Sequence, residues 1–514
     1  MLAKLLPLLL AMRALPLAAQ SLASGPPPAE PLAIVGVTLV PMDREAIRSG
    51  QTLVVEGGRI VALGPDDEVA VPAGATLVDG RGRFLMPGLA DMNVRLEDPN
   101  DLLLYLANGV TAVRNLGPPE MALRLRTQVE AGTLPGPLVT TAGETIDRWP
   151  ASAEDHVGAA DPEAVRRIVR EQAAMGVDFV AVTPLLSTEV YAAAARAVLE
   201  AGLWLSGDAP VEGGLAAAAR GRQRSIDHLV NVLFVHFGRD LDRTEIDVAA
   251  RLLHEAGIRV TTGISAFDKA AAQFGDPSEM HRLMMRPEVA YANPGARREW
   301  GWGNAFVSRP PSAYLADARR FLRPLARGLA DGGVRLVLGT DANTAGNVPG
   351  FSVHDELRAL VESGLTPYQA LRTATVHAAE LVGAADEFGT LAVGRRADLL
   401  LLETKPARGR RPREAAGGGG GERTLVPGGE AAGRPRRSGG PLPRPRRGAG
   451  GALPDRPTGP GGCPGRRRPA AARPSLGPRS PVPPGDARGR NSPRGSSCRR
   501  PSRVRPRCPS GADA

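Results

Sequence analysis

The sequence predicts an α/β fold: a (β/α)8 TIM-like barrel with a small β-sandwich domain built from segments flanking the barrel. Two patterns carry this prediction. Between residues 84 and 383, short aliphatic runs alternate with helical stretches, which is typical of parallel strands joined by helices. On both sides of that region, strand-like runs follow one another with turns and no helices between them.

The N-terminal part of the small β-domain covers residues 33–83. Strand-like runs occur at 34–40 and 51–56, and a glycine pair then turns the chain into 59–64. A further strand pair is expected at 69–78. The C-terminal part covers residues 384–406, with strand-like runs at 388–391 and 396–402. We expect both parts to form one domain.

The barrel region, residues 84–383, contains eight strand-like segments, at 86–96, 109–115, 138–142, 177–182, 203–207, 224–228, 258–262 and 334–341. Helices are expected at 161–175, 188–201 and 245–256. The first of these has Asp161 as its N-cap and Pro162 at its first position. Residues 274–311 are irregular, aromatic and basic, and we expect them to form a loop over the barrel mouth.

The charge of the chain is concentrated at its C-terminal end. The formal net charge is +10, but residues 407–514 hold 25 Arg, no Lys and 6 acidic residues, so residues 1–406 are acidic. This tail is rich in Arg, Pro and Gly and has no aromatic residue, Ile or Met, so it is expected to be disordered. Its abrupt onset favours a frameshift in a GC-rich gene. A genuine tail would bind nucleic acid or another anionic surface.

Residues 1–24 are a candidate signal peptide. Lys4 gives a positive start, residues 5–12 are mostly apolar, and small residues follow. An exported protein, periplasmic or secreted, is therefore expected, with a cytoplasmic location as the alternative. The apolar run is shorter than the roughly 20 residues that a membrane-spanning helix needs, and no other segment is predicted to be transmembrane. All three cysteines lie in the tail, which excludes a disulfide or cysteine-based zinc site from the globular part.

Several segments together resemble the amidohydrolase superfamily of metal-dependent hydrolases, in its imidazolonepropionase-like and prolidase-like branch. They include Met-Pro-Gly-Leu-Ala-Asp-Met-Asn-Val-Arg at 86–95, Ala-Asn-Gly-Val-Thr at 107–111, and Leu-Gly-Thr-Asp at 338–341. The resemblance covers residues 33–406. It implies hydrolysis of C–N bonds other than peptide bonds by metal-activated water, in a cyclic amide or dipeptide-like small molecule. Such sites lie at the C-terminal ends of the barrel strands.

Most metal-ligand positions that this resemblance implies are changed. The family has two histidines on the first strand, where this chain has Asn93 and Arg95. The carboxylated lysine of the fourth strand is replaced by Ala181, and the histidine of the fifth by Asp208. These differences at four of six positions exclude a lysine-bridged pair of metals. They predict a degraded metal site.

His228 on the sixth strand and Asp341 on the eighth keep the family's residue types. A single divalent metal (Zn, Mn or Fe) held by Asp208, His228 and Asp341, with Asp341 also as the catalytic base, is one interpretation. The other is that no metal binds. His354 lies in a family-like stretch after the eighth strand. It is expected to contact the ligand residues without binding the metal, or to pack against a loop over the site.

Three functional hypotheses follow. The chain is a weak amidohydrolase-type hydrolase, a catalytically inactive barrel that serves as a binding or scaffold protein (a pseudoenzyme), or a decayed gene product. A small-molecule ligand is expected for the first two, and a homo-oligomer is compatible with each. We further expect Arg95 to take the place of the lost cation by pairing with Asp341 or Asp208, since a buried carboxylate needs a partner.

Overall fold

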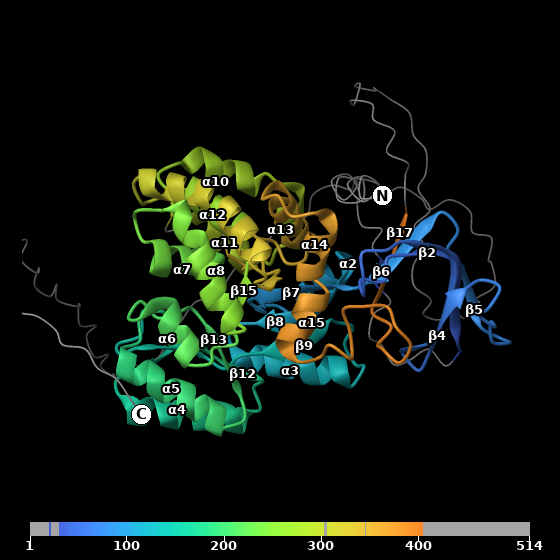
Figure 1. Ribbon diagram of the computed structural model, residues 1–514, viewed down its shortest axis with the longest axis horizontal. Helices are drawn as coiled ribbons and strands as arrows, with labels where there is room; N and C mark the ends of the chain where they lie inside the picture. The colour runs from blue at the N-terminus through green and yellow to red at the C-terminus, as the bar shows by residue number, and fades with distance from the viewer. Residues whose placement is uncertain (1–19, 22–29, 303–305, 345, 404–514) are drawn as a thin grey trace, which may run out of the picture. The chain divides into compact units, whose positions relative to one another are not determined.

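The structure is a computed structural model that describes residues 20–21, 30–302, 306–344 and 346–403 (Figure 1). The predicted tail at 407–514 lies outside these residues. So does the predicted signal peptide, apart from Gln20–Ser21, which form strand β1. Within the described ranges, no helix is both long and apolar enough to cross a membrane.

The small β-domain contains a seven-stranded sheet with the order β1-β17-β6-β2-β3-β4, and β5 pairs with β2. Its strands are β1 (Gln20–Ser21), β2 (Leu32–Leu39), β3 (Arg48–Glu56), β4 (Arg59–Pro65), β5 (Thr76–Asp79), β6 (Arg83–Pro87) and β17 (Leu399–Glu403). The antiparallel pairing of β17 with β6 joins segments from both flanks of the barrel, as the sequence predicts. Leu39, Leu53, Ile60 and Leu85 form part of its buried core.

The strand expected at residues 388–391 is wrong. The chain bends there, and Leu391 donates from its backbone to Pro41. Gly389 has φ 91°, and a Cβ on it would lie 2.8 Å from the carbonyl oxygen of Thr375. The segment therefore packs closely against the preceding helical region and does not extend along the sheet.

The eight barrel strands are parallel and occur in the predicted order. They are β7 (Leu89–Val94), β8 (Val110–Asn115), β9 (Leu138–Thr141), β12 (Phe179–Val182), β13 (Trp204–Gly207), β14 (Ser225–Ile226), β15 (Arg259–Thr261) and β16 (Leu336–Val337). A backbone hydrogen bond of 2.9 Å from Met92 to Leu338 connects the first strand to the eighth. This closure confirms the predicted (β/α)8 barrel.

Helices cover the outside of the barrel (Figure 1). The α-helices are α2 (Asn100–Ala107), α3 (Pro119–Glu130), α4 (Pro162–Met175), α5 (Thr188–Glu200), α6 (Gly214–Arg220), α7 (Leu229–Val232), α8 (Ile246–Glu255), α9 (Ile264–Ala272), α10 (Pro277–Met284), α11 (Pro294–Trp302), α12 (Ala313–Asp331), α13 (Phe351–Glu362), α14 (Pro367–Thr373) and α15 (Val376–Val382). Asp161 caps α4 as expected, accepting from the backbone nitrogens of Glu163 and Ala164.

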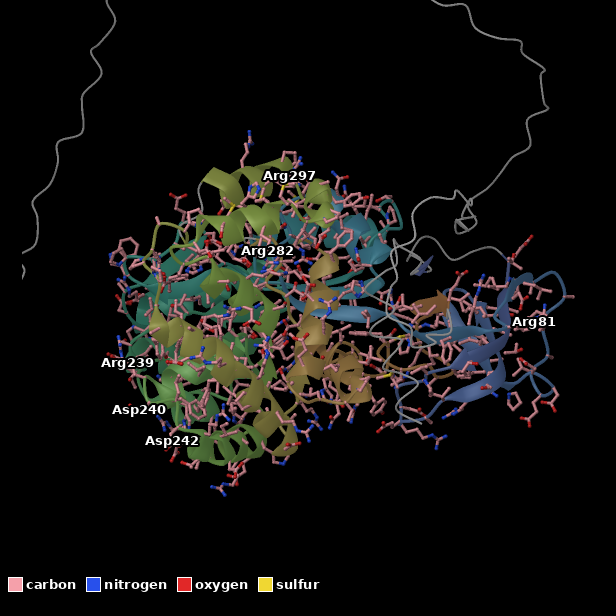
Figure 2. The ribbon with its side chains drawn as sticks, turned by 90° about the horizontal axis from the view of Figure 1, so that it is seen from above. Arg81, Arg239, Asp240, Asp242, Arg282 and Arg297 are labelled. Carbon is pink, nitrogen blue, oxygen red and sulfur yellow. The ribbon has the colours of Figure 1, made fainter. Side chains whose placement is uncertain are left out.

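The described residues also form the short helical turns η2 (Leu233–Phe237), η3 (Arg243–Glu245) and η4 (Pro287–Tyr291). Between η2 and η3, Arg239, Asp240 and Asp242 lie together on the barrel surface (Figure 2), and all three are exposed. This charged turn belongs to the loop region after β14.

Two parts of the barrel differ from the sequence prediction. Strands β10 (Thr145–Arg148) and β11 (His156–Ala159) form a parallel pair between β9 and α4 that the sequence analysis missed. The expected loop at 274–311 instead contains α10, η4 and α11. It packs on the loop after β16, where Trp300 Nε1 donates to the backbone oxygen of Asn343 at 3.0 Å.

The turn from the small domain into the barrel requires glycine. Gly88 separates β6 from β7, and a Cβ on it would lie 2.1 Å from Oγ1 of Thr111. Its backbone nitrogen donates to Asp398 at 2.8 Å. The close approach fixes where β7 begins, and hence which residues reach the barrel mouth at its other end.

Candidate functional site

The predicted site residues lie at the C-terminal ends of the barrel strands. Asn93 is on β7 and Arg95 follows that strand, while Asp208, His228 and Asp341 follow β13, β14 and β16. This is the end of a (β/α)8 barrel where active sites occur. The fold therefore places these five residues where the sequence analysis expects them.

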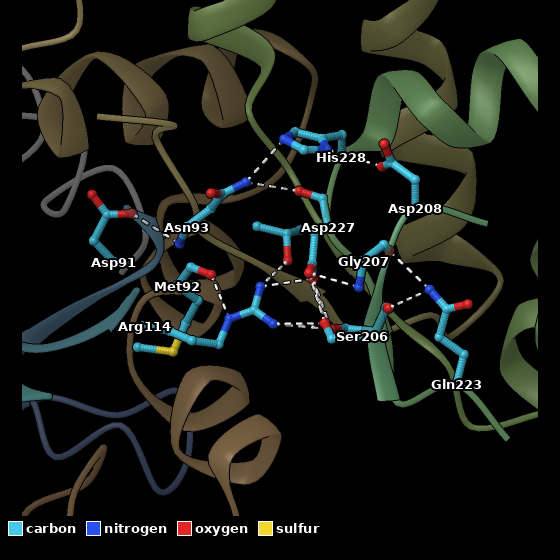
Figure 3. A network of polar contacts seen from close by, with 12 residues as sticks. Asp91, Met92, Asn93, Arg114, Ser206, Gly207, Asp208, Gln223, Asp227 and His228 are labelled. Carbon is cyan, nitrogen blue, oxygen red and sulfur yellow. Dashed lines mark hydrogen bonds and ion pairs between the residues drawn. The ribbon is translucent and has the colours of Figure 1, made fainter. Parts of the chain in front are cut away.

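Asn93, His228 and Asp208 form a hydrogen-bonded chain across three strand ends (Figure 3). Nδ2 of Asn93 lies 3.1 Å from Nε2 of His228, and Nδ1 of His228 lies 2.9 Å from Oδ1 of Asp208. Asn93 Nδ2 also donates to the backbone oxygen of Asp227 at 3.1 Å. Both ring nitrogens of His228 therefore have partners within the protein.

The surroundings of His228 favour its charged form. Burial disfavours the imidazolium, but the charge and hydrogen bond of Asp208, together with the charges of Asp341 and Asp227, raise the pKa of His228 to about 9. The His228 side chain is 35% exposed, so solvent reaches it at the barrel mouth. This pKa favours an imidazolium at neutral pH, held by the Asp208 carboxylate. In that form Nε2 is itself a donor, so it accepts from Asn93 Nδ2 only when the ring is neutral.

Arg95 does not form the expected pair with Asp341 or Asp208. Its guanidinium instead forms a hydrogen-bonded ion pair with Asp155 and lies 3.7 Å from Glu97. Burial disfavours the Arg95 cation, yet the hydrogen bond and charge of Asp155, with the charges of Asp341 and Glu97, raise its pKa. The expected partners are wrong because Asp155 comes from the β10–β11 segment, which the sequence analysis did not anticipate.

Asp341 has an unusual backbone and an unengaged carboxylate. Its φ is 52°, in the left-handed region that non-glycine residues rarely adopt, and its backbone nitrogen donates to Asn93 at 2.9 Å. No described residue forms a hydrogen bond or ion pair with its side chain. The charge of Asp341 nevertheless contributes to the raised pKa of both Arg95 and His228.

Ala181 and His354 take no part in the polar chain. Ala181 is fully buried on β12, in an apolar cluster with Ala142 and Phe179. His354 is on α13, where Nδ1 is buried without a hydrogen-bond partner among the described residues. Burial lowers the pKa of His354 to about 4, so this side chain is neutral. The supporting role expected of His354 stays a prediction.

The sequence analysis missed Arg114, a cation in the middle of the barrel. Its side chain is fully buried on β8, and Nη2 donates to Oδ1 of Asp227 at 2.7 Å (Figure 3). Nη1 donates to Ser206 and Ser225 at 2.9 and 3.1 Å. The available signal was an arginine inside an otherwise apolar strand, since such a charge needs a buried partner.

The residues present do not fit a metal ion. A histidine ligand must offer a ring lone pair, and both nitrogens of His228 are engaged. Arg95 adds a permanent cation beside the former ligand positions, and Ala181 supplies no donor atom. Within residues 20–21, 30–302, 306–344 and 346–403, no three His, Cys, Asp or Glu side chains gather into a metal-binding group. The set Asp208, His228 and Asp341 is therefore not assembled as metal ligands.

Known proteins share this architecture of a (β/α)8 barrel with a β-rich domain from its flanks. The Amidohydrolase family model matches residues 188–425. That range contains Asp208, His228 and Asp341 but begins after Asn93 and Arg95 of the first strand.

Parts of the chain are also similar in sequence to imidazolonepropionases. The chain is 34% identical to the imidazolonepropionase of Geobacillus kaustophilus over 138 residues, which span 26% of this chain and 29% of that enzyme. It is 43% identical to that of Deinococcus deserti over 83 residues, 16% of this chain and 20% of the relative. The aligned segments thus cover less than a third of these enzymes. Residues 188–425 thus resemble the amidohydrolase family in sequence, and the aligned segments resemble imidazolonepropionases.

Two solved structures show the shared fold. A Xaa-Pro dipeptidase with bound methionine in its active site has a TM-score of 0.57 at 20% identity, covering 73% of this chain and 95% of the dipeptidase. The bottromycin amidohydrolase has a TM-score of 0.58 at 23% identity, covering 74% of this chain and 83% of that enzyme. At these identities the likeness concerns the fold alone.

Proposed function

We propose that the chain is a slow amidohydrolase-family hydrolase that cleaves a C–N bond in a small cyclic amide or dipeptide-like molecule without a metal ion. The observation that carries this proposal is the 2.9 Å contact between His228 Nδ1 and Asp208, beside the unengaged carboxylate of Asp341. A carboxylate and an imidazolium at one barrel mouth supply a proton acceptor and a proton donor.

The chemistry divides between these two groups. The Asp341 carboxylate accepts a proton from water as the water oxygen bonds to the carbonyl carbon of the substrate. The His228 imidazolium then donates its Nε2 proton to the leaving nitrogen as the C–N bond breaks. Asp208 orients the ring through Nδ1 and stabilises its charge. The products are a carboxylic acid and an amine group, and the proton on Asp341 passes to Nε2 of His228, which restores both groups.

Asn93 must release Nε2 for this reaction. In the structure that nitrogen faces the Asn93 amide at 3.1 Å, so substrate has to displace the side chain. Removing this contact costs about 1 kcal/mol. General acid–base catalysis by one group contributes roughly 100- to 10,000-fold, which is small beside a metal-activated water. A slow enzyme is the expected result.

The test is hydrolysis of a panel of cyclic amides, N-acyl amino acids and dipeptides by protein treated with a chelator. Asp341→Asn and His228→Gln should each abolish turnover while leaving the unfolding temperature nearly unchanged. Glu212→Gln is the matched control, because Glu212 is an exposed carboxylate that binds Thr188 and, within the described part of the chain, forms no hydrogen bond with Asn93, His228 or Asp341. Turnover that requires added metal, or that survives both substitutions, contradicts the proposal.

A second candidate is a binding protein with an inactive barrel. It is favoured by the internal pairing of the polar groups: Asn93 and Asp208 satisfy His228, and Asp155 satisfies Arg95. Ligand binding without turnover, reduced by Asp341→Asn, would support this candidate over the hydrolase.

A further inference from the structure

Arg114 contacts the segments that carry both partners of the Asn93–His228 pair. Its Nε donates to the backbone oxygen of Met92 at 2.6 Å, and Met92 immediately precedes Asn93 on β7. Its Nη2 donates to Asp227 at 2.7 Å, and Asp227 immediately precedes His228 after β14. One planar guanidinium thus spans the barrel interior between the two strands whose next residues meet at 3.1 Å (Figure 3).

Asp227 is held from several sides, so its position is tightly defined. Its carboxylate accepts from Ser206 Oγ at 2.7 Å, from Ser225 Oγ at 2.8 Å and from the backbone nitrogen of Gly207 at 2.8 Å. Its own backbone oxygen accepts from Asn93. Asp227 and Arg114 are both fully buried, and their carboxylate and guanidinium are matched in charge.

Aromatic rings pack below the guanidinium. Cζ of Arg114 lies 5.3 Å from the ring centroid of Phe179 and 5.9 Å from that of Trp204, and the two rings are stacked with centroids 4.3 Å apart. Nη2 also approaches Thr261 Oγ1 at 3.3 Å. Few alternative positions are open to a group packed against rings and bonded to β7, β13, β14 and β15.

We propose that Arg114 is a positioning residue that acts through Met92 and Asp227 to hold His228 in register with Asn93 and Asp208. A buried ion pair by itself contributes little net stability, because desolvation offsets the attraction. Loss of Arg114 should affect the positions of the strand ends more than the stability. Without it, Met92 on β7 and Asp227 after β14 lose the side chain that binds both of them in the barrel interior. This inference rests on the proposed use of His228 in hydrolysis, but it also concerns a hydrogen bond that exists without substrate.

The experiment uses the full chain with labelled histidine and observes the hydrogen-bonded imidazole N–H of His228 by NMR, assigned with His228→Gln. The main variant is Arg114→Gln/Asp227→Asn, which removes both charges and leaves no buried ion unpaired. Arg114→Lys is the second variant, because one ammonium keeps the charge but cannot reach Met92 and Asp227 together. The matched control is Arg126→Gln/Asp178→Asn, an ion pair of 2.8 Å from α3.

The signal observed is that of the His228 Nδ1–H bonded to Asp208. It should disappear in both Arg114 variants and persist in the control. With a hydrolysed substrate in hand, kcat should fall about 100-fold with little change in KM, since a misplaced catalytic group costs roughly that much. A folded Arg114 variant that keeps the N–H signal overturns the inference. If the wild-type protein hydrolyses none of the substrates, the proposed function is wrong. The positioning role of Arg114 is still tested, because the N–H signal of His228 is measured without substrate.

Discussion

Nδ2 of Asn93 lies 3.1 Å from Nε2 of His228, at strand ends where the superfamily resemblance implies two metal-binding histidines. This contact connects positions that a cation would otherwise bridge. The same mouth holds Arg95, paired with Asp155 from the β10–β11 segment. The polar residues at the strand ends thus contact one another or a nearby residue: Asn93 and Asp208 contact His228, and Asp155 pairs with Arg95.

Metal content follows directly from this pairing. We expect protein purified without added metal to contain far less than one equivalent of Zn, Mn or Fe, because His228 offers no free nitrogen. Elemental analysis of wild type and Asp208→Ala is the measurement. About one metal per chain, lost in Asp208→Ala, would restore the single-metal interpretation instead.

Asp155→Asn should disturb the mouth without unfolding the barrel. The substitution removes the main partner of Arg95, whose side chain is 27% exposed and retains Glu97 nearby. A partly exposed pair contributes about 1 kcal/mol or less to the free energy of unfolding. Urea unfolding should show a loss of that size. A loss several times larger would mean that the β10–β11 segment depends on this contact.

Gly207→Ala should destabilise the barrel strongly. Gly207 has φ 108°, and a Cβ on it would lie 2.2 Å from the carbonyl oxygen of Val182 on the neighbouring strand. Its backbone nitrogen also binds Asp227. We expect a loss of about 3 kcal/mol or more, measured by urea unfolding. Gly257→Ala is the control, since that position also has a positive φ, 67°, but nothing within 4 Å of the added Cβ.

The free energy of unfolding should fall in acid through His377. Burial lowers the pKa of His377 to about 4, although a hydrogen bond to Leu336 opposes the shift. In the unfolded chain His377 has a pKa near 6.5, so it binds a proton at pH values where the folded protein keeps it neutral. Stability is therefore lost as the pH falls from about 6.5 towards 4, by up to about 3 kcal/mol.

The measurement is urea unfolding of wild type and His377→Gln between about pH 7 and pH 4. Glutamine retains a donor for the Leu336 oxygen at 2.9 Å but does not titrate. The variant should lose less stability across this range than wild type. Equal slopes for the two proteins would exclude His377 as a source of the pH dependence.

The sequence by itself determined the order of the eight barrel strands and the return of the run predicted at 396–402 to the small domain. These follow from local patterns: aliphatic runs and caps such as Asp161. The strand-end positions of Asn93, Asp208, His228 and Asp341 follow from the superfamily resemblance. Strand ends are recognisable because the apolar run stops there.

Only the tertiary structure decided which charges meet. Arg95 binds Asp155, 60 residues away, and Arg114 binds Asp227, 113 residues away. Several carboxylates were available to each arginine, and the choice depends on distances between strands that are distant in the sequence. The unanticipated β10–β11 segment brought one partner to the mouth, and barrel closure brought the other to the interior. Local periodicity carries no information on either distance.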